Sequence, residues 1–291
     1  MKKKIRIGTR ESLLACAQAE QLKQYIETNW PQYEAVLVKM KTTGDKILDR
    51  NLDEIGGKGL FVKELDAALY ENRTDLSVHS LKDMPMELSE DFPILGFSRR
   101  EDPRDALVLP QGCETLDVLK PVGTSSPRRR VQLAQLYPGC KVRSVRGNVL
   151  TRLHKLDSGE YGALVLAAAG LRRLGLTHRI SSCYPVSQMV PAAGQGILAI
   201  QGRKDFDQKI LRGFFDENAR WQALAERSFI REFGGGCSSP AAAYADVSAD
   251  SVTLTGMIVT KEGILQKKQM TAAKQEAEQL GMRLAHVLRS R

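Results

Sequence analysis

The chain has little of what several classes of protein require. Its longest run of small apolar residues, 163–170, is far shorter than the ~18 residues that cross a membrane. The first residues are basic, but no apolar stretch of signal-peptide length follows them, so we expect a cytoplasmic protein with no membrane partner. The four histidines have no metal-ligand spacing, and we expect no bound metal.

Cysteine and aromatic residues are also sparse. The cysteines lie far apart and are odd in number, at positions 16, 113, 140, 183 and 237. This spacing excludes CxxC-type zinc sites and argues against a disulfide framework, which favours a reducing compartment. Aromatic residues make up only 6% of the chain, which is few for a protein that stacks on nucleic-acid bases.

Positive charge, by contrast, is abundant and concentrated. Of the net charge of +9, nearly all lies between residues 99 and 179, where arginine greatly outnumbers lysine. Arginine presents a planar set of donors that matches carboxylate or phosphate groups. Nucleic acid is the first candidate for such a segment, but only Tyr137 and Tyr161 accompany these arginines, and no zinc-finger or RNP-type motif occurs. A small polyanionic ligand fits better.

Strand and helix patterns alternate through the first two thirds of the chain. This alternation predicts α/β units with parallel sheets and helices on both faces. We expect the strand at 197–201 to return to the first sheet. After Trp221 the pattern becomes one helix, three alternating strands and a last helix, which predicts a small α+β domain. The main predicted strands are 5–7, 35–40, 76–78, 94–97, 106–109, 141–145, 164–167, 241–246, 252–259 and 264–270, and the main helices are 12–26, 63–70 and 275–288.

Several predicted strand-to-helix turns carry arginine. In the segment 123–130, Ser126 is a good N-cap and Pro127 a good first helical residue. The helix dipole repels an arginine in the first turn by about 0.3–1 kcal/mol, unless an anion lies on the helix N-terminus. Arginines recur in the turns at 8–12, 146–152 and 170–173. Each alone is most simply a solvated surface charge, but their recurrence at these turns favours an anion site.

Two further residues have unusual settings. A helical pattern runs up to three glycines and then Cys237, so the thiol lies on an open loop where a bulky electrophile can reach it. The alternative is a helix C-cap followed by an incidental small residue. Asp83 follows a predicted strand and precedes Pro85, which suggests a rigid turn. A carboxylate there can stabilise developing positive charge or move protons; the alternative is a salt bridge with Lys82 or a turn cap.

Seven motifs follow one another along essentially the whole chain. They are GTRES at 8–12, GKGLF at 57–61, HSLKDMP at 79–85, GTSSPRR at 123–129, RGNVLTRL at 146–153, AAGQG at 192–196 and GC at 236–237. Together they resemble hydroxymethylbilane synthases, also called porphobilinogen deaminases. These transferases make the linear tetrapyrrole precursor of haem by joining four porphobilinogens head to tail, with release of ammonia at each step.

The resemblance implies a role for each matched residue. Cys237 would carry a dipyrromethane cofactor through a thioether, and Asp83 would be the catalytic carboxylate beneath the pyrrole nitrogens. Acetate and propionate groups on each pyrrole would supply the counter-charge for the arginines. Cofactor binding is implied for Cys237, Lys82, Asp83, Ser126, Arg128 and Arg129. Substrate binding is implied for Arg10, Ser12, Gln18, Lys58, Phe61, Arg146, Arg152, Arg173, Gln195 and Gly196.

The resemblance also implies three domains: two similar doubly wound α/β units like those of periplasmic binding proteins, and a smaller α+β unit. We place the first at 1–98 with 195–216, the second at 99–194 and the third at 217–291, in a monomer. A two-lobed anion-transport protein would share the fold but need no Cys237, and a nucleic-acid binder would leave Asp83 unexplained. The glycine-rich segment 41–59 is expected to close over the pyrrole chain and exclude water; the alternative is a surface loop without a catalytic part.

Overall fold

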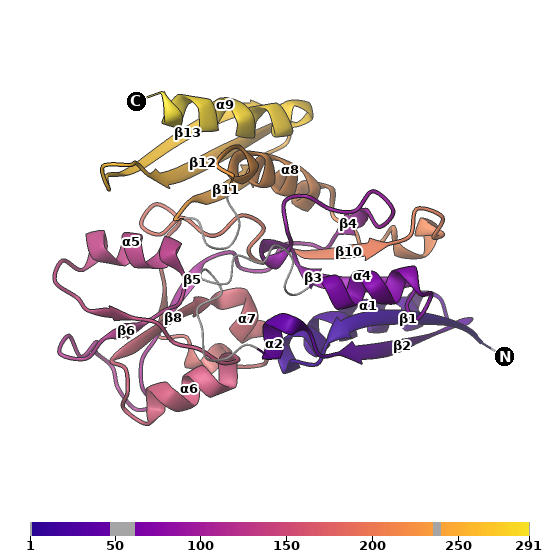
Figure 1. The fold of residues 1–291 in the computed structure, drawn as a ribbon, viewed down its shortest axis with the longest axis horizontal. Helices are drawn as coiled ribbons and strands as arrows, with labels where there is room; N and C mark the ends of the chain where they lie inside the picture. Colours follow the sequence, from indigo (N-terminus) through magenta and orange to yellow (C-terminus); the bar gives the residue numbers. More distant parts are fainter. Residues whose placement is uncertain (1, 47–61, 235–239, 291) are drawn as a thin grey trace. The chain divides into compact units, whose positions relative to one another are not determined.

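The computed structural model describes residues 2–46, 62–234 and 240–290 (Figure 1). The chain forms two compact units, called here the first and the second unit. The first comprises Met1–Glu101 and Ile197–Arg220, and the second comprises Asp102–Gly196 and Trp221–Arg291. The second unit therefore contains both an α/β sheet and a separate antiparallel sheet. The boundaries of three domains given above stay a prediction.

The first unit is built on a five-stranded sheet with the order β2-β1-β3-β10-β4. β1 (Lys3–Arg10) pairs in parallel with β2 (Tyr33–Met40) and with β3 (Leu76–Ser80). β10 (Leu198–Gly202) lies between β3 and β4 (Ile94–Phe97) and is antiparallel to both. The predicted return of the chain to the first sheet is thus confirmed.

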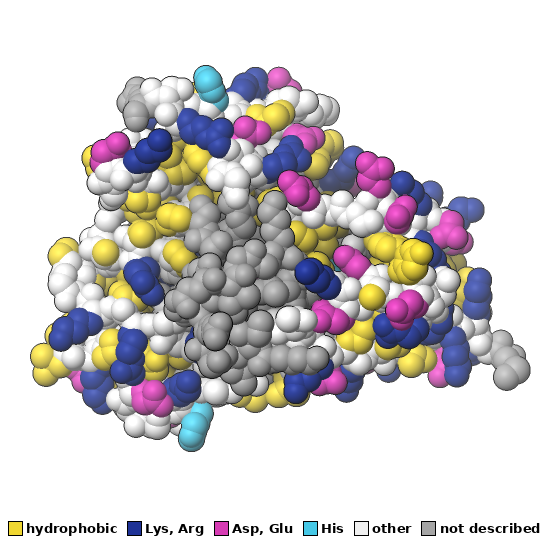
Figure 2. Space-filling model, in the orientation of Figure 1, with side chains coloured by type: hydrophobic (Ala, Val, Ile, Leu, Met, Phe, Trp, Pro, Cys, Tyr) yellow, Lys and Arg dark blue, Asp and Glu magenta, His cyan; other side chains and the backbone are white. Residues whose placement is uncertain are grey.

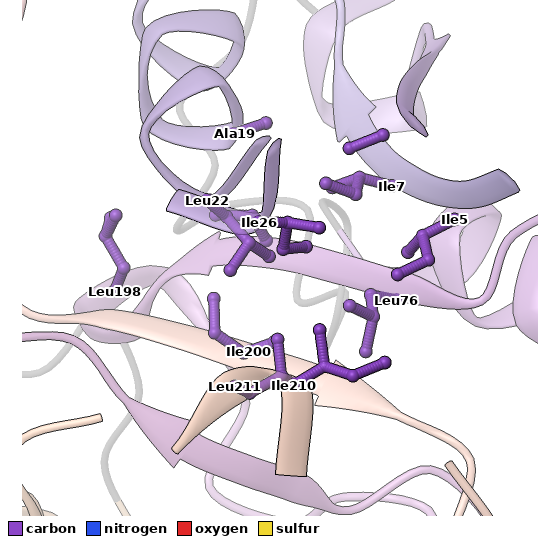
Figure 3. Close-up of a cluster of buried hydrophobic side chains, with 12 residues drawn as sticks. Ile5, Ile7, Ala19, Leu22, Ile26, Leu76, Leu198, Ile200, Ile210 and Leu211 are labelled. Carbon is purple, nitrogen blue, oxygen red and sulfur yellow. The ribbon is translucent and has the colours of Figure 1, made fainter. Parts of the chain in front are cut away.

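One long helix covers the core of this sheet. α1 (Leu13–Asn29) begins where the Ser12 hydroxyl accepts a hydrogen bond from the Ala15 amide, as expected of an N-cap. Its buried face meets the strands at 3.6-residue spacing (Figure 3). That core includes Ile5, Ile7, Ala19, Leu22, Ile26, Leu76 and Ile200. The other helices of the unit are α2 (Thr43–Lys46), α4 (Lys63–Tyr70) and the short 3₁₀ helices η1 (Leu81–Asp83) and η3 (Gln208–Leu211).

The α/β sheet of the second unit repeats this plan, with the order β7-β6-β8-β5-β9. β6 (Val122–Gly123) is parallel to β7 (Val142–Arg143) and β8 (Ala163–Ala167). β5 (Asp105–Val108) is antiparallel to β8 and to β9 (Ser182–Cys183). The helices here are α5 (Pro127–Leu136), α6 (Val149–Asp157), α7 (Ala168–Arg173) and the 3₁₀ helix η2 (Thr177–Arg179).

Each of these two sheets has one antiparallel strand in the same position, so the prediction of two similar units is confirmed. The prediction of parallel sheets holds for the other strands of each sheet and is wrong for this one. The antiparallel strands are β5 and β10. Both follow a passage of the chain from one unit to the other. A strand returns in parallel only through a crossover connection within its own sheet, and neither β5 nor β10 is preceded by one.

The remainder of the second unit is the predicted α+β domain. β11 (Ala242–Val247), β12 (Ser251–Val259) and β13 (Leu265–Ala273) form an antiparallel meander. The helices α8 (Glu217–Glu232) and α9 (Ala277–Arg289), with the 3₁₀ helix η4 (Lys274–Glu276) between β13 and α9, complete the described elements. A Cβ placed on Gly281 of α9 would lie 2.4 Å from the Ala225 carbonyl oxygen of α8, so the two helix backbones are in close contact.

Candidate functional site

Asp83 lies on a turn that two buried residues hold in place. η1 follows β3 directly, and the Leu81 amide at its start donates to the Ile197 carbonyl at 3.0 Å. The Met84 amide closes the turn by donating to the Leu81 carbonyl at 3.2 Å. Leu81 is fully buried and Met84 is 2% exposed, whereas Lys82 and Asp83 between them are partly exposed. The apolar residues of the motif therefore anchor the turn and leave its charged side chains at the surface.

The Asp83 carboxylate makes no hydrogen bond and no ion pair with any residue that the structure describes. A salt bridge with Lys82 or a turn cap was the alternative interpretation of this residue, and neither is present. Side-chain oxygens held on a rigid turn without a protein partner keep their full capacity to accept hydrogen bonds and to stabilise positive charge. Among the predicted site residues of the first unit that the structure describes, Asp83 is the one whose side chain has no protein partner.

The remaining predicted residues of the first unit are engaged with their own unit. Gln18 is 4% exposed, and its Nε2 donates to Ser80 Oγ at 2.8 Å, immediately before η1. Arg10 is paired with Asp45, with 3.2 Å between Arg10 Nε and Asp45 Oδ2. Burial alone would raise the pKa of Asp45, but hydrogen bonds from Arg10 and Thr42 hold it below its ordinary value. Gln18 thus supports the Asp83 turn, and Arg10 is held in one orientation.

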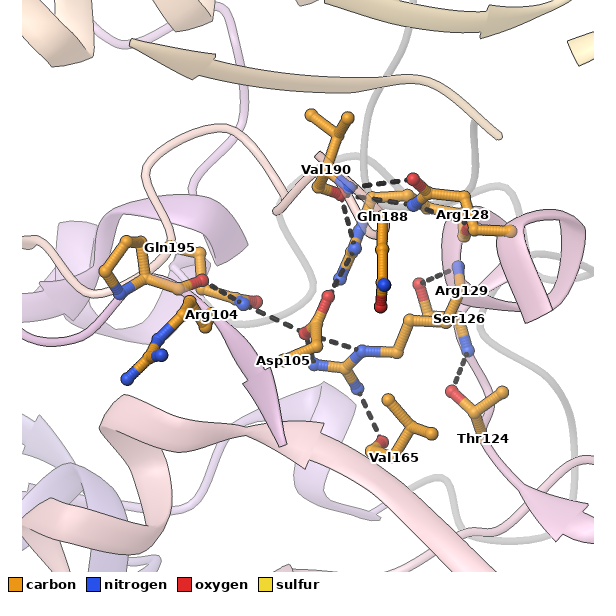
Figure 4. Close-up of polar contacts among 12 residues, drawn as sticks. Arg104, Asp105, Thr124, Ser126, Arg128, Arg129, Val165, Gln188, Val190 and Gln195 are labelled. Atoms are coloured by element: carbon orange, nitrogen blue, oxygen red, sulfur yellow. Dashed lines mark hydrogen bonds and ion pairs between the residues drawn. The ribbon is translucent and has the colours of Figure 1, made fainter. Parts of the chain in front are cut away.

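The arginines of the GTSSPRR motif are buried in the second unit. Ser126 caps α5 by accepting from the Arg129 amide at 3.5 Å, and Pro127 is near the start of the helix, as predicted. Arg128 and Arg129 are only 4% and 7% exposed, and both guanidinium groups point at Asp105, the first residue of β5 (Figure 4). The anion expected near the start of this helix is therefore, in part, a carboxylate of the protein itself.

Asp105 is fully buried; its Oδ1 accepts from both arginines, and its Oδ2 accepts from Arg128. Arg128 Nη1 lies 2.6 Å from Oδ2, and Arg129 Nη2 lies 2.7 Å from Oδ1. Arg128 also donates to the Val190 carbonyl, and Arg129 donates to the Val165 carbonyl. Burial by itself opposes ionisation, but the two positive charges outweigh it and hold the pKa of Asp105 far below its usual value.

The AAGQG motif lies beside this cluster. Gln195 is 1% exposed, and its Nε2 donates to Asp105 Oδ1 at 2.9 Å and to the Pro103 carbonyl at 2.7 Å. Gly194 and Gly196 have φ of +73° and +92°, in the left-handed region that glycine adopts without strain. Arg173 Nη2 donates to the Gly196 carbonyl at 2.7 Å, so two of the predicted substrate residues are in direct contact.

The third predicted anion turn is compact as well. Asn148 caps α6 by accepting from the Thr151 amide at 2.9 Å. One turn into the helix, Arg152 Nε donates back to the carbonyl of Gly147, the residue after Arg146, at 2.8 Å. Both arginines remain partly exposed. This turn therefore offers two partly exposed cations, of which Arg152 is oriented by its hydrogen bond, near the start of a helix, where an anion is stabilised.

The structure groups the described site residues by unit. Arg10, Ser12, Gln18, Lys82 and Asp83 belong to the first unit. Ser126, Arg128, Arg129, Arg146, Arg152, Arg173, Gln195 and Gly196 belong to the second. Cys237, Lys58, Phe61 and the greater part of 41–59 lie outside the described residues.

Sequence reasoning missed two buried acids that organise the second unit, Asp105 and Glu226. Glu226 on α8 is 0% exposed and accepts from the Gly194 amide at 2.6 Å and from the Ala245 amide at 2.7 Å. The available signal was an acid at the edge of an apolar strand or on the apolar face of a helix. Such a position requires a buried partner, but the sequence does not say which residue provides it.

Two models of one protein family match successive parts of this chain. The family model described as "Porphobilinogen deaminase, dipyromethane cofactor binding domain" matches residues 5–212, and "Porphobilinogen deaminase, C-terminal domain" matches residues 221–290. The chain belongs to the porphobilinogen deaminase family. The porphobilinogen deaminase of Acetivibrio thermocellus is 53% identical over 97% of each chain. That of Alkaliphilus oremlandii is 52% identical over 97% of this chain and 95% of the relative.

Among solved structures, the periplasmic aliphatic sulphonate binding protein SsuA from Escherichia coli has a TM-score of 0.41 and 13% identity, and the match covers 78% of this chain and 68% of that one.

Membership of the porphobilinogen deaminase family makes the chain an enzyme of tetrapyrrole biosynthesis that polymerises porphobilinogen and uses a dipyrromethane cofactor. No helix among the described ranges is long and apolar enough to cross a membrane.

The donor groups of the second unit fit a cofactor that carries carboxylates. Two buried guanidinium groups share one carboxylate, so one positive charge of the cluster is not compensated by Asp105. Arg128 Nε makes no hydrogen bond with a described residue. A further carboxylate oxygen would supply an acceptor for this Nε and a second negative charge beside the two guanidinium groups.

The Asp105 cluster predicts a pH-dependent contribution to stability. Because the pKa of Asp105 is lowered in the folded chain, its stabilisation is present above the unfolded pKa of about 3.9 and is lost as the pH falls. We expect Asp105→Asn to lower the free energy of unfolding by about 3–5 kcal/mol at pH 7. Thermal unfolding from pH 8 to pH 3 should show a constant difference from the unsubstituted chain above pH ~5 and a shrinking one below ~4.

Asp157→Asn is the matched control for this prediction, because Asp157 pairs with Arg179 at a more exposed place in the same unit, with 29% of its side chain accessible. It should lower stability by about 1 kcal/mol or less. A difference between Asp105→Asn and the unsubstituted chain that does not change between pH 7 and pH 3 would contradict the assignment.

Proposed function

We propose that this chain joins four porphobilinogens head to tail into hydroxymethylbilane, with release of ammonia, on a dipyrromethane held by Cys237 through a thioether. Asp83 is the catalytic carboxylate in this proposal. The observation that carries it is the state of Asp83, whose carboxylate lies partly exposed on an anchored turn without any described partner. The family match supplies the reaction to which this carboxylate contributes.

The role of Asp83 follows from its charge and its support. A deaminated pyrrole carries developing positive charge that is shared with the ring nitrogen, and a nearby carboxylate lowers its energy. Such stabilisation is most effective when the carboxylate is already oriented before the substrate binds. This orientation is provided by the buried side chains of Leu81 and Met84 and by the hydrogen bond from Gln18 to Ser80. Asp83 therefore accepts N–H hydrogen bonds and stabilises cationic substrate without a large rearrangement.

Cys237 is the proposed attachment point for the cofactor, which when bound would supply the free, nucleophilic pyrrole carbon that attacks the deaminated substrate. α8 ends at Glu232, and the Gly234 amide donates to the Arg231 carbonyl at 3.0 Å in its closing turn. Cys237 follows this turn by three residues. Of the other cysteines, Cys16 lies in α1 and Cys183 in β9, whereas Cys113 and Cys140 follow β5 and α5, each after a single glycine rather than three.

The cationic residues are proposed to divide between cofactor and substrate. Lys82, Ser126, Arg128 and Arg129 hold carboxylates of the cofactor. Arg10, Ser12, Arg146, Arg152 and Arg173 hold those of incoming substrate and of the growing chain, with Gln18, Gln195 and Gly196 contributing further contacts, each from its own unit. The supporting observation is burial: Arg128 and Arg129 are nearly inaccessible, which suits a resident group, whereas Arg146 and Arg152 are partly exposed, which suits an exchanging one.

We further propose a monomeric cytoplasmic enzyme without a nucleic-acid partner. Tyr161 is 4% exposed with its hydroxyl donating to the Ser144 carbonyl, and Tyr137 packs edge-on against Tyr184. These tyrosines are therefore occupied within the protein. Figure 2 shows Lys and Arg side chains interspersed with acidic ones over the visible face. This mixture is not typical of a surface that follows a phosphate backbone.

Replacing Cys237 tests the attachment point. The purified active protein should exceed the 32.2 kDa chain by the mass of two linked pyrroles, and Cys237→Ser should lose this mass, the colour with Ehrlich's reagent and the activity. Cys113→Ser is the control, because Cys113 is an exposed free cysteine whose loss should change none of these properties. A fully active preparation with the unmodified mass would refute the proposal.

Replacing Asp83 tests the catalytic carboxylate. Asp83→Asn preserves the shape of the side chain and removes its charge, so kcat should fall by about 10²–10³ or more while the cofactor mass and the melting temperature stay near their original values. Asp91→Asn removes an exposed carboxylate of the same unit and should leave kcat unchanged. Near-normal turnover of Asp83→Asn would move the catalytic role to another group.

Replacing Arg152 separates substrate binding from cofactor binding. Arg152→Leu should retain the cofactor mass but weaken elongation about 10- to 100-fold in kcat/KM, since a hydrogen bond to a charged group contributes about 1.5–3 kcal/mol. Arg130→Leu is the control, because Arg130 is an exposed arginine of α5 that has no proposed role. Loss of the cofactor mass in Arg152→Leu, or unchanged kinetics, would contradict the division between the two sets of arginines.

A further inference from the structure

A chain of buried polar contacts runs through the second unit from α5 to α8. At one end, Arg128 and Arg129 converge on Asp105 (Figure 4). Gln195 Nε2 joins them at Asp105 Oδ1, at 2.9 Å. At the other end, Glu226 of α8 accepts from the Gly194 amide, the residue directly before Gln195. The cluster around the two arginines is therefore connected by hydrogen bonds to α8.

The intervening segment is tied to α5 a second time. Gln132 is 1% exposed, accepts from the Val190 amide at 2.7 Å and donates to the Val190 carbonyl at 3.1 Å. Arg128 donates to the same carbonyl at 2.7 Å. Residues 190–195 thus have backbone or side-chain bonds to α5, to β5 and to α8. Every group in this network is buried, so a lost contact is not replaced by water without cost.

Asp105 is the only described acid that this network places against the two arginines. Its Oδ1 accepts from Arg128, Arg129 and Gln195, and its Oδ2 accepts from Arg128. Two guanidinium groups at such close range repel each other unless an anion lies between them. With Asp105 ionised, the arginines are held in one arrangement before any ligand is present. Without its charge, the Val190 and Val165 carbonyls still accept from the arginines, but the negative charge that offsets the repulsion between the two guanidinium groups is lost.

We propose that Asp105 is a positioning residue for cofactor acquisition, because it orients Arg128 and Arg129. Through Gln195 and Glu226 it also fixes the position of these arginines relative to α8, the helix that leads to Cys237. This inference rests on the proposed attachment at Cys237. Asp105 itself is not proposed to contact the cofactor. Its contribution is to assemble the receiving arginines in advance, which lowers the entropy that binding would otherwise lose.

The test measures cofactor occupancy in folded protein. The unsubstituted chain, Asp105→Asn and Glu226→Gln are expressed at low temperature and their melting temperatures determined. Occupancy is then measured by intact mass at least ~10 °C below the melting temperature of each variant, where the folded state predominates. The same samples are treated with a maleimide, and the label at Cys237 is quantified by peptide mass.

We expect Asp105→Asn to be folded but to carry about tenfold less cofactor or lower, the effect of losing one charge-assisted hydrogen bond. Its Cys237 should be correspondingly open to maleimide. Glu226→Gln, which retains one acceptor oxygen, should show a smaller loss in the same direction. Apoprotein of both variants should also convert more slowly than unsubstituted apoprotein when porphobilinogen is added, as followed by mass.

Asp157→Asn is the control, since it removes a carboxylate paired with Arg179 in the same unit and should keep full occupancy. Full occupancy of folded Asp105→Asn, with only its melting temperature lowered, would overturn the inference and leave Asp105 a stabilising residue. If Asp105→Asn does not fold, Glu226→Gln decides by the same criterion. Absence of a pyrrole adduct from the unsubstituted protein would instead refute the proposed attachment at Cys237.

Discussion

The interaction on which the second unit depends is the burial of two guanidinium groups against one carboxylate. Isolated buried charges cost several kcal/mol each, and an ion pair compensates for this only when the geometry is good and the remaining donors are satisfied. Arg128, Arg129 and Asp105 meet most of these conditions: the geometry is close, and the carbonyls of Val165 and Val190 accept from further donors, although Arg128 Nε has no hydrogen bond with a described residue. The result is a nearly inaccessible centre in which two guanidinium groups share the single negative charge of Asp105.

The two passages of the chain between the units carry many of the residues that support the site. Asp105 stands at the start of β5, shortly after the first passage, and Gln195 and Gly196 stand immediately before the second. On the far side of that second passage, the Ile197 carbonyl accepts from the Leu81 amide at the start of the Asp83 turn. Backbone that enters a sheet as its antiparallel strand is thus used in each unit to fix functional side chains.

The charged residues of the site differ in whether contacts with the protein already hold their side chains. Most of the described arginines already have protein acceptors: Asp45 for Arg10, the Gly147 carbonyl for Arg152 and the Gly196 carbonyl for Arg173. Such contacts restrict long side chains, which lowers the entropy lost when a ligand carboxylate binds. Asp83 alone among the described acids of the candidate site has no such contact. Its charge is available to a cationic ligand, and its position is set by the turn beneath it.

The sequence by itself determined the element types, the two similar α/β units, the α+β end of the chain and the family, because periodicity and short motifs are local properties. It also determined which side chains are candidates: Asp83 from its place before Pro85, and Arg128 and Arg129 from their place in the first turn of a helix. Only the tertiary structure decided that Asp83 has no partner among the described residues and that these arginines are buried against Asp105. It also decided that β5 and β10 are antiparallel. Side-chain pairing and strand direction depend on contacts between residues that are distant in sequence, such as Asp105 and Gln195, which are 90 positions apart. Local sequence patterns do not show which distant residues meet.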